Sequence, residues 1–174
     1  MKRYIYSRAL QASPNAAHLA LANLSLSERL KSIAPSAKFT LITQNIDGLS
    51  TAAFRQVCPD GEPNLYEMHG RLFDTICTVC GDCKHNTDSP ICPALSGTED
   101  TFGTEEKDIP LEDLPRCREC GGLLRPGVVW FDEMPLYLDE IGKLVDEADL
   151  ALVVGTSSTV CYTASLCNLC SNLS

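Results

Sequence analysis

The sequence predicts an α/β fold in which a parallel sheet is interrupted by a small cysteine-rich module. Helix-like and strand-like patterns alternate along the chain, as in sheets covered by helices. Residues 149–154 are apolar on both faces, which is typical of a buried parallel strand. Two C-x-x-C motifs separate the two halves of this pattern. We therefore expect one discontinuous domain over residues 1–70 and 123–174, with a module over residues 71–122 inserted into it.

Composition restricts the class of protein. The chain has 174 residues, of which 44% are hydrophobic, and this indicates a globular domain with a real core. Its net charge of −9 argues against non-specific nucleic-acid binding, which depends on Lys and Arg, and weakly favours basic partners. No apolar run approaches the about 20 residues of a membrane span, and no secretory or transit segment is recognisable. We expect an intracellular protein with reduced cysteines.

The first half of the chain predicts a helix, a strand and a polar loop. Ser13 and Pro14 suit the start of a helix, and the apolar spacing predicts that it runs from about 14 to 33. Pro35 ends it, and residues 38–43 read as a buried strand. The strand delivers residues 44–48 to the carboxyl edge of the sheet, where ligands bind in α/β proteins. Residues 50–64 read as loop and turn.

The second half begins with a short strand around residues 65–68, which places His69 at its end. Residues 89–115 are rich in Pro, Gly, Thr and acid and predict an irregular insertion. Residues 127–131 are extended and apolar, a helical pattern follows from Leu138 to Ala148, and the 149–154 strand ends in a glycine followed by hydroxyl side chains. Such an ending suits a ribose or phosphate.

The two C-x-x-C motifs predict one structural zinc site with four ligands. Each motif turns two thiolates toward one point, and four thiolates leave no open coordination position for catalysis. The alternatives are two disulfides or four unrelated core thiols, and Cys83 could replace one ligand. Glycines after each motif favour the metal site, because its turns need a permissive backbone. The predicted ligands are Cys77, Cys80, Cys117 and Cys120.

Other polar positions each have a structural and a functional interpretation. His69, between a strand and Gly70, is either a structural hydrogen-bonding group or a general base, because imidazole gains and loses a proton near neutral pH. Residues 44–47 are either an Asx-rich turn or a ligand-binding loop, and residues 155–158 either a helix cap or a ligand contact. Trp130 and Phe131 are expected to pack in the core.

Taken together and in order, these segments resemble the sirtuins, the NAD-dependent protein-lysine deacylases. The resemblance covers residues 4 to about 160 and rests on residues 43–49 (TQNIDGL), His69 and Gly70, the two cysteine motifs, residues 125–133 (RPGVVWFDE) and residues 155–158 (GTSS). Residues 89–97 (SPICPALSG) and 114–117 (LPRC) resemble the class III branch, which removes succinyl, malonyl and glutaryl groups.

The resemblance implies a partial Rossmann-like NAD-binding domain with a small zinc domain, and an acyl-lysine peptide that meets NAD in the cleft between them. In the family reaction nicotinamide leaves, and the base activates a ribose hydroxyl so that the acyl group ends on ADP-ribose. The implied base is His69. The implied NAD contacts are Gln44, Asn45, Ile46, Asp47, Gly155, Thr156 and Ser157. The implied substrate contacts are Tyr4, Arg8, Val128, Val129, Trp130, Phe131 and Glu133.

The chain also departs from the family pattern. It begins inside the family's core, without the Gly-Ala-Gly phosphate loop, and after Val160 it has a Cys-, Ser- and Asn-rich tail, so the expectation is a catalytic domain truncated at both ends. Class III enzymes carry an Arg three residues after the Tyr, whereas Ser7 holds that place here and Arg8 follows. Asp132 stands where the family commonly has Gly.

Two functions fit these sequence features. The first is a deacetylase or desuccinylase acting on acyl-lysine proteins or peptides, with NAD and one structural Zn²⁺, and without direct nucleic-acid or membrane binding. The second is a non-catalytic, zinc-containing interaction fragment that has lost NAD affinity. Family resemblance implies mitochondria, with the cytoplasm or nucleus as alternatives.

Overall fold

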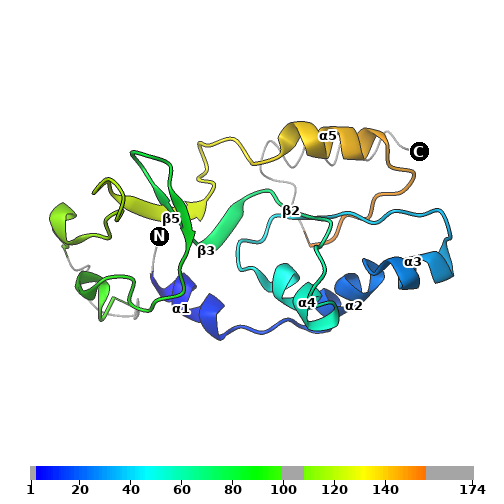
Figure 1. Ribbon diagram of the computed structural model, residues 1–174, viewed down its shortest axis with the longest axis horizontal. Coiled ribbons are helices and arrows are strands. Elements are labelled where there is room, and N and C mark those ends of the chain that lie inside the picture. Colours follow the sequence, from blue (N-terminus) through cyan, green and yellow to red (C-terminus); the bar gives the residue numbers. More distant parts are fainter. Residues whose placement is uncertain (1–2, 99–107, 156–174) are drawn as a thin grey trace.

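The computed structural model describes residues 3–98 and 108–155, with side chains from Tyr6 onward (Figure 1). Two small sheets lie side by side along the long axis of the molecule. The elements are α1 (Arg3–Gln11), α2 (Ala16–Leu24), α3 (Ser27–Ile33), β1 (Leu41–Thr43), α4 (Leu49–Val57), β2 (Leu65–Glu67), β3 (Gly70–Cys77), β4 (Cys83–His85), β5 (Leu124–Val128) and α5 (Leu138–Asp146), with short 3₁₀ turns at Pro93–Leu95 and Leu111–Asp113.

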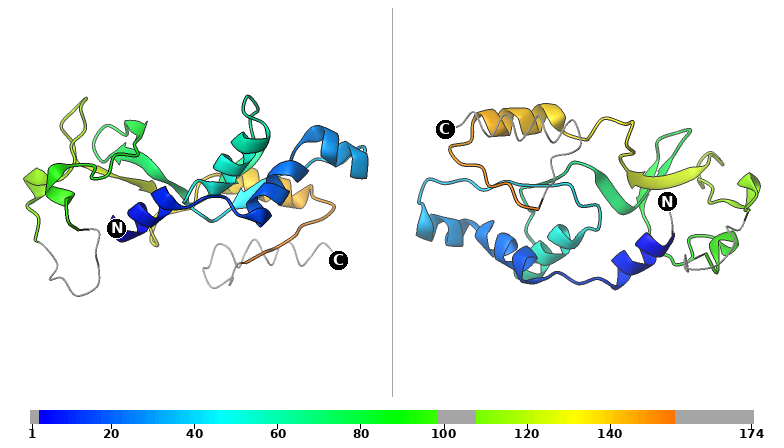
Figure 2. Two further views of the ribbon diagram at one scale, coloured as in Figure 1. Left: turned by 90° about the horizontal axis from the view of Figure 1, so that it is seen from below. Right: turned by 180° about the vertical axis from the view of Figure 1, so that it is seen from behind.

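The first sheet is the parallel pair β1–β2, with Leu41 opposite Leu65 and Thr43 opposite Glu67. Helix α4 joins the two strands, and α5 and the α2–α4 pair lie on opposite sides of them (Figures 1 and 2). The parallel pair and its covering helices confirm the α/β prediction. Residues 50–57 were predicted as loop, which is wrong. Tertiary packing explains the helix there, because Ala53 and Phe54 are buried against Ala22 of α2.

The single helix predicted over residues 14–33 is two helices. Asn15, not Ser13, caps α2, since its Oδ1 accepts hydrogen bonds from the amides of Ala17 at 3.0 Å and His18 at 3.1 Å. The break falls at Leu26, whose extended backbone lets its side chain join the cluster of Ala22 and Phe54. Periodicity alone does not reveal a break that keeps the same face buried.

The second sheet is antiparallel, in the order β4–β3–β5. The β3–β5 register shifts between Arg71 and Thr75, so residues 72–74 bulge away from β5. Helix α1, which the sequence pattern did not predict, packs on this sheet through Tyr6, Leu72 and Val128. In the described part of residues 89–115, predicted to be irregular, the only regular elements are two short 3₁₀ turns.

The two sheets join at His69 and Gly70. The Met68 amide donates to the Thr43 carbonyl at 3.1 Å in the first sheet, and Gly70 opens β3 in the second. Met68 is 1% exposed and packs against Ile141 and Val145 of α5, the helix that the sequence predicted. The junction is therefore held by backbone bonds on both sides and by core packing beneath.

Of two strand predictions near the end of the chain, one is wrong and the other is right only in part. Residues 149–155 form no regular element, and Leu150 and Leu152 are 77% and 81% exposed. An apolar run becomes a strand only when a neighbouring strand supplies hydrogen-bond partners, and within the described residues β1 pairs with β2 alone. The extended run at 127–131 forms a strand only as far as Val128, and Phe131, at 101% exposure, is not a core residue.

No helix in the described part of the chain is long and apolar enough to span a membrane.

We predict that Gly70→Ala destabilises the protein by about 1–3 kcal/mol. Gly70 has φ +75°, and an added Cβ would collide with the carbonyl oxygen of Gly127. Gly142→Ala is the matched control, because a Cβ there meets nothing within 4 Å and alanine favours the α5 helix. Urea unfolding followed by circular dichroism measures both variants. Equal stability of the Gly70→Ala variant and the native chain would contradict the close contact.

Candidate functional site

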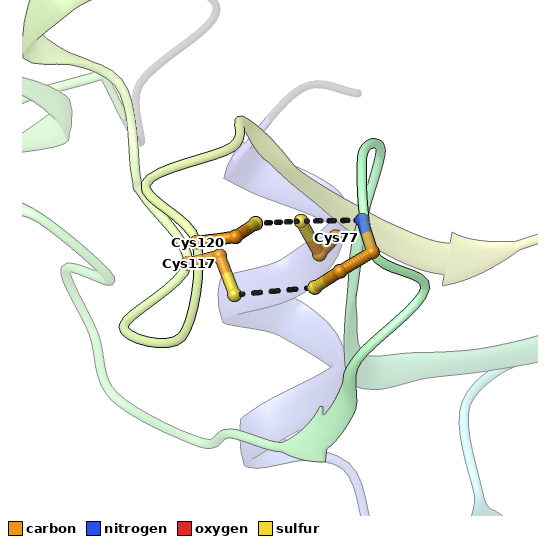
Figure 3. Close-up of side chains that lie close together, drawn as sticks. Cys77, Cys117 and Cys120 are labelled. Carbon is orange, nitrogen blue, oxygen red and sulfur yellow. Dashed lines mark hydrogen bonds between the residues drawn. The ribbon is translucent and has the colours of Figure 1, made fainter.

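Four cysteine sulfurs converge between the two C-x-x-C motifs. The Sγ atoms of Cys77, Cys80, Cys117 and Cys120 all lie within 4.8 Å of one another. Figure 3 shows the side chains of Cys77, Cys117 and Cys120 close together. Cys77 and Cys120 are 3.4 Å apart, and Cys80 and Cys117 are 3.8 Å apart. Sulfurs around a tetrahedral zinc ion, with bonds of about 2.3 Å, lie about 3.8 Å apart. The four thiols therefore fit a structural zinc site.

Both motifs fold into the same turn. The Gly81 amide donates to the Cys77 carbonyl at 3.1 Å, and the Gly121 amide donates to the Cys117 carbonyl at 2.9 Å. In return, the amides of Cys77 and Cys117 donate to carbonyls five residues later, at 2.9 and 2.8 Å. Gly81 and Gly121 have φ values of +74° and +73°, which explains the glycine after each motif.

The alternatives to a four-cysteine site do not match the geometry. Disulfide sulfurs are about 2.05 Å apart, well below the separations found here. Cys83 lies on β4, outside the group of converging sulfurs.

Backbone amides stabilise the thiolate form of Cys77, which is the form that binds a metal. The amides of Cys80 and Val79 point at the Cys77 sulfur, at 3.5 and 3.4 Å, and lower the pKa of the Cys77 thiol to about 6. The Cys80 thiol has a pKa raised to about 12, because contacts with the sulfurs of Cys120 and Cys77 outweigh the amide of Asp82. Four thiols this close favour a shared cation, since thiolates repel one another without it.

His69 lies at the junction of the sheets, half-buried and two residues after the end of β2. Its Nδ1 is 3.1 Å from the carbonyl oxygen of Gln44, and its own carbonyl accepts the Val129 amide at 2.9 Å. Because a carbonyl oxygen only accepts, Nδ1 carries the hydrogen in this contact, which leaves the Nε2 lone pair as the basic atom. This arrangement suits a general base as well as a structural role.

The polar loop after β1 lies next to His69. Asn45 is exposed, and its amide donates to Thr43 Oγ1 at 3.1 Å. The Ile46 carbonyl accepts the Leu72 amide at 2.8 Å, which ties the loop to β3. Asp47 Oδ1 accepts the Leu49 amide at 3.0 Å at the start of α4. The loop is thus an Asx turn that also presents amide and carboxylate groups at the carboxyl edge of the parallel sheet.

Residues 128–133 form a strand end followed by a closed turn. Val128 is buried and Val129 half-buried. Glu133 binds Arg125 through two bonds of 2.8 and 3.1 Å, and its Oε2 accepts the Trp130 amide at 3.1 Å. The Trp130 amide and the Arg125 guanidinium lower the pKa of the Glu133 carboxyl. Within this structure Glu133 closes the turn, and Trp130 and Phe131 are exposed on it.

The remaining predicted residues are placed only in part. Arg8 is exposed on α1, while the side chain of Tyr4 lies outside the described part of that helix. Gly155 is exposed with φ +69°, and Thr156 and Ser157 lie outside the described residues. Sequence reasoning missed the charged group around Arg71 on β3. The acidic residues at 67 and 74 on either side of Arg71 were the available signal.

The comparisons with known proteins identify the family. The model of the Sir2 family matches residues 1–162. The chain belongs to the Sir2 family. Among curated relatives, it is 46% identical to the mitochondrial NAD-dependent protein deacylase sirtuin-5 of Xenopus tropicalis over 166 residues, covering 90% of this chain and 48% of the relative. It is 47% identical to the sirtuin-5 of Canis lupus familiaris over 171 residues, covering 94% and 51%.

Solved Sir2 structures have the same fold. A Sir2 homologue mutant in complex with ADP-ribose superposes with a TM-score of 0.71 at 34% identity, covering 99% of this chain and 57% of that one. A Sir2 homologue–NAD complex superposes with a TM-score of 0.68 at 35% identity, covering 95% and 52%. The Rossmann-like α/β class is thereby confirmed. The chain spans about half the length of the curated relatives that it matches.

We predict one Zn²⁺ per chain by elemental analysis, and loss of that zinc in Cys77→Ser. Removal of one thiolate opens the tetrahedral shell, and binding free energy is folding free energy for such modules. Cys83→Ser is the control, because Cys83 lies outside the converging sulfurs, and it should keep its zinc. Equal zinc content in both variants would exclude the four-cysteine site.

We predict that the 130–133 turn keeps its structure to a lower pH than a turn closed by a glutamate of ordinary pKa. The lowered pKa of Glu133 means that the contact is present above the usual value of 4.5 and is lost only as the pH falls through the lower, folded-state value. Trp130 is the single tryptophan and reports the turn by fluorescence. Its emission should stay constant from pH 7 down to 4.5, provided that a zinc indicator shows the metal retained. Glu133→Gln should already change the emission at pH 7, and an unchanged spectrum would show that the turn does not depend on the carboxylate.

Proposed function

We propose that this chain carries the catalytic base and substrate-binding strand of an NAD-dependent protein-lysine deacylase. The observation that supports this most strongly is the contact between His69 and the carbonyl of Gln44, which sets the imidazole beside the polar loop of residues 44–47. The sirtuin-5 relatives are named as deacylases, and they share nearly half of their aligned residues with this chain. The zinc site supports the antiparallel sheet and takes no part in the reaction.

The loop after β1 fits the nicotinamide end of NAD. It lies where ligands bind in α/β sheets, and its groups are neutral amides with one carboxylate, which tolerate a positively charged ring. Asn45 is exposed and offers both a donor and an acceptor. The Asp47 carboxylate has a second oxygen that could accept from a carboxamide. When bound, NAD supplies nicotinamide as the leaving group and ADP-ribose as the acyl acceptor.

His69 is proposed to remove a proton from a ribose hydroxyl. The Gln44 carbonyl holds the hydrogen on Nδ1, so Nε2 receives the proton, and the same carbonyl stabilises the imidazolium that results. The Val129 amide fixes the His69 backbone from the other side. These two contacts orient the ring without using its basic nitrogen.

Strand β5 is proposed to receive the acyl-lysine peptide. Among the described residues β5 pairs with β3 along one edge only, so an extended peptide can add along the other edge at its Val128 end, before the turn that Glu133 closes. One of the solved relatives, at 28% identity, is a Sir2–p53 peptide–NAD⁺ complex. We propose acyl-lysine peptides as the substrate class. Arg8, as a cation on α1, is the proposed contact for an acidic acyl group, together with Tyr4.

Mitochondria are the proposed location, because the sirtuin-5 relatives carry that location in their names.

The test is NAD-dependent removal of succinyl and acetyl groups from lysine peptides, followed through the nicotinamide that NAD releases. We expect turnover by the chain, and a loss of about 10²-fold or more in His69→Ala, the usual contribution of a general base. His18→Ala is the control, because His18 lies at the start of α2, away from the site. Turnover that survives in His69→Ala would refute the assignment. No turnover, no NAD binding by calorimetry and intact zinc would favour the non-catalytic interaction fragment instead.

A further inference from the structure

A chain of charged side chains surrounds the turn that carries His69. Arg71 Nε lies 2.7 Å from Asp74 Oδ2 and 3.8 Å from Glu67 Oε2. The other oxygen of Asp74 is 3.1 Å from Nδ1 of His85 on β4. The side chains of Glu67 and Asp74 are only 13% and 9% exposed, whereas that of Arg71 is 54% exposed. One accessible guanidinium therefore serves two carboxylates that are largely withdrawn from water.

The positions of these residues along the chain show which segments the charged group connects. Glu67 is the last residue of β2, two residues before His69. Asp74 lies at the end of the bulge in β3, where pairing with β5 resumes at Thr75. Arg71 thus connects the strand before the histidine with the bulge after it. The turn between them includes Gly70 in the left-handed region, which has little local preference for one conformation.

The charges explain why a cation is needed here. Burial raises the pKa of the Glu67 carboxyl, Arg71 and a hydrogen bond from Thr51 oppose this, and the charges of Asp74 and Asp47 add to it. Three carboxylates therefore lie near the end of β2. A buried carboxylate without a partner is costly, so removal of the guanidinium favours a rearrangement that brings Glu67 or Asp74 to water.

We propose that Arg71 is a positioning residue for His69: by binding Glu67 on one side and Asp74 on the other, it holds the intervening turn in the conformation that the base requires. This inference rests on the proposed role of His69. Arg71 itself need not touch substrate or NAD. The two amides that report the turn are those of Val129, which donates to the His69 carbonyl, and Leu72, which donates to the Ile46 carbonyl.

The experiment is amide hydrogen exchange followed by NMR on the zinc-loaded chain, without NAD or peptide. In Arg71→Met we expect the Val129 and Leu72 amides to exchange about tenfold faster, because the turn opens locally. The Thr78 amide, which donates to Leu123 in the zinc module, should be unchanged and shows that the module remains folded. Arg71→Lys should restore most of the protection, since it keeps the charge.

A second readout is the carboxyl titration of Glu67. Because Arg71 lowers the pKa of Glu67, Arg71→Met should raise that pKa further, whereas the control Arg55→Met, an exposed arginine on α4, should not. Native protection of both amides in Arg71→Met, or equal effects in Arg55→Met, would overturn the proposal. If Arg71→Met fails to fold, Glu67→Gln decides, since loss of one partner should still speed exchange at Val129 and unchanged exchange there would refute the role.

These readouts separate this inference from the proposed function. The exchange and titration measurements need no turnover. If the chain is inactive but Arg71→Met changes amide exchange and the pKa of Glu67 as expected, the deacylase proposal is refuted and the role of Arg71 in holding the turn is supported. If the chain is active, Arg71→Met should lower kcat about tenfold or more, with the peptide KM changed less than about twofold, because the base and not the peptide strand is displaced. A change in KM alone would contradict the positioning role.

Discussion

The backbones of Gly70 and Gly127 meet where the parallel pair and the antiparallel sheet join, and the rest of the structure depends on this contact. Gly70 turns with φ +75°, and neither glycine has room for a Cβ, since one added at Gly127 would lie 2.9 Å from the Cβ of Asp74. The close approach lets Val128 pair with Gly70 and places Val129 against the His69 carbonyl. The candidate base, the candidate peptide strand and the bulge of β3 are therefore positioned by one backbone contact.

The zinc module and the histidine site lie at opposite ends of the antiparallel sheet. The four cysteines hold the far end, where β3 and β4 meet the second C-x-x-C motif, and Lys84 adds an ion pair to Glu119 at 2.7 Å. The near end of β3 carries the turn with His69 and the charges around Arg71. A zinc ion held by these cysteines would be joined to the histidine site only through β3, as expected for a structural metal and not a catalytic one.

Much of this arrangement was predictable from sequence because it depends on local chemistry. The paired C-x-x-C motifs, the strand before residues 44–47 and the helix with Ile141 and Val145 on one face are specified by spacing. What failed depends on partners distant in sequence. Helix α4 forms because Phe54 is buried against α2, and residues 149–155 stay irregular where a strand needs a neighbour. The part that His85 plays in the charged group around Arg71 was also not predictable, because His85 meets Asp74 only once β3 and β4 pair.

The two C-x-x-C motifs fold into turns with the same hydrogen-bond pattern, and this has a consequence for how such modules diversify. Each turn closes through hydrogen bonds inside six consecutive residues. Its shape therefore does not depend on the number of residues between the two motifs. The entropy of closing a flexible loop grows slowly, by about 0.6 kcal/mol for each doubling of length. The polypeptide between the two motifs can therefore be lengthened or exchanged with little loss of folding free energy. New recognition surfaces can evolve there while the metal site stays unchanged.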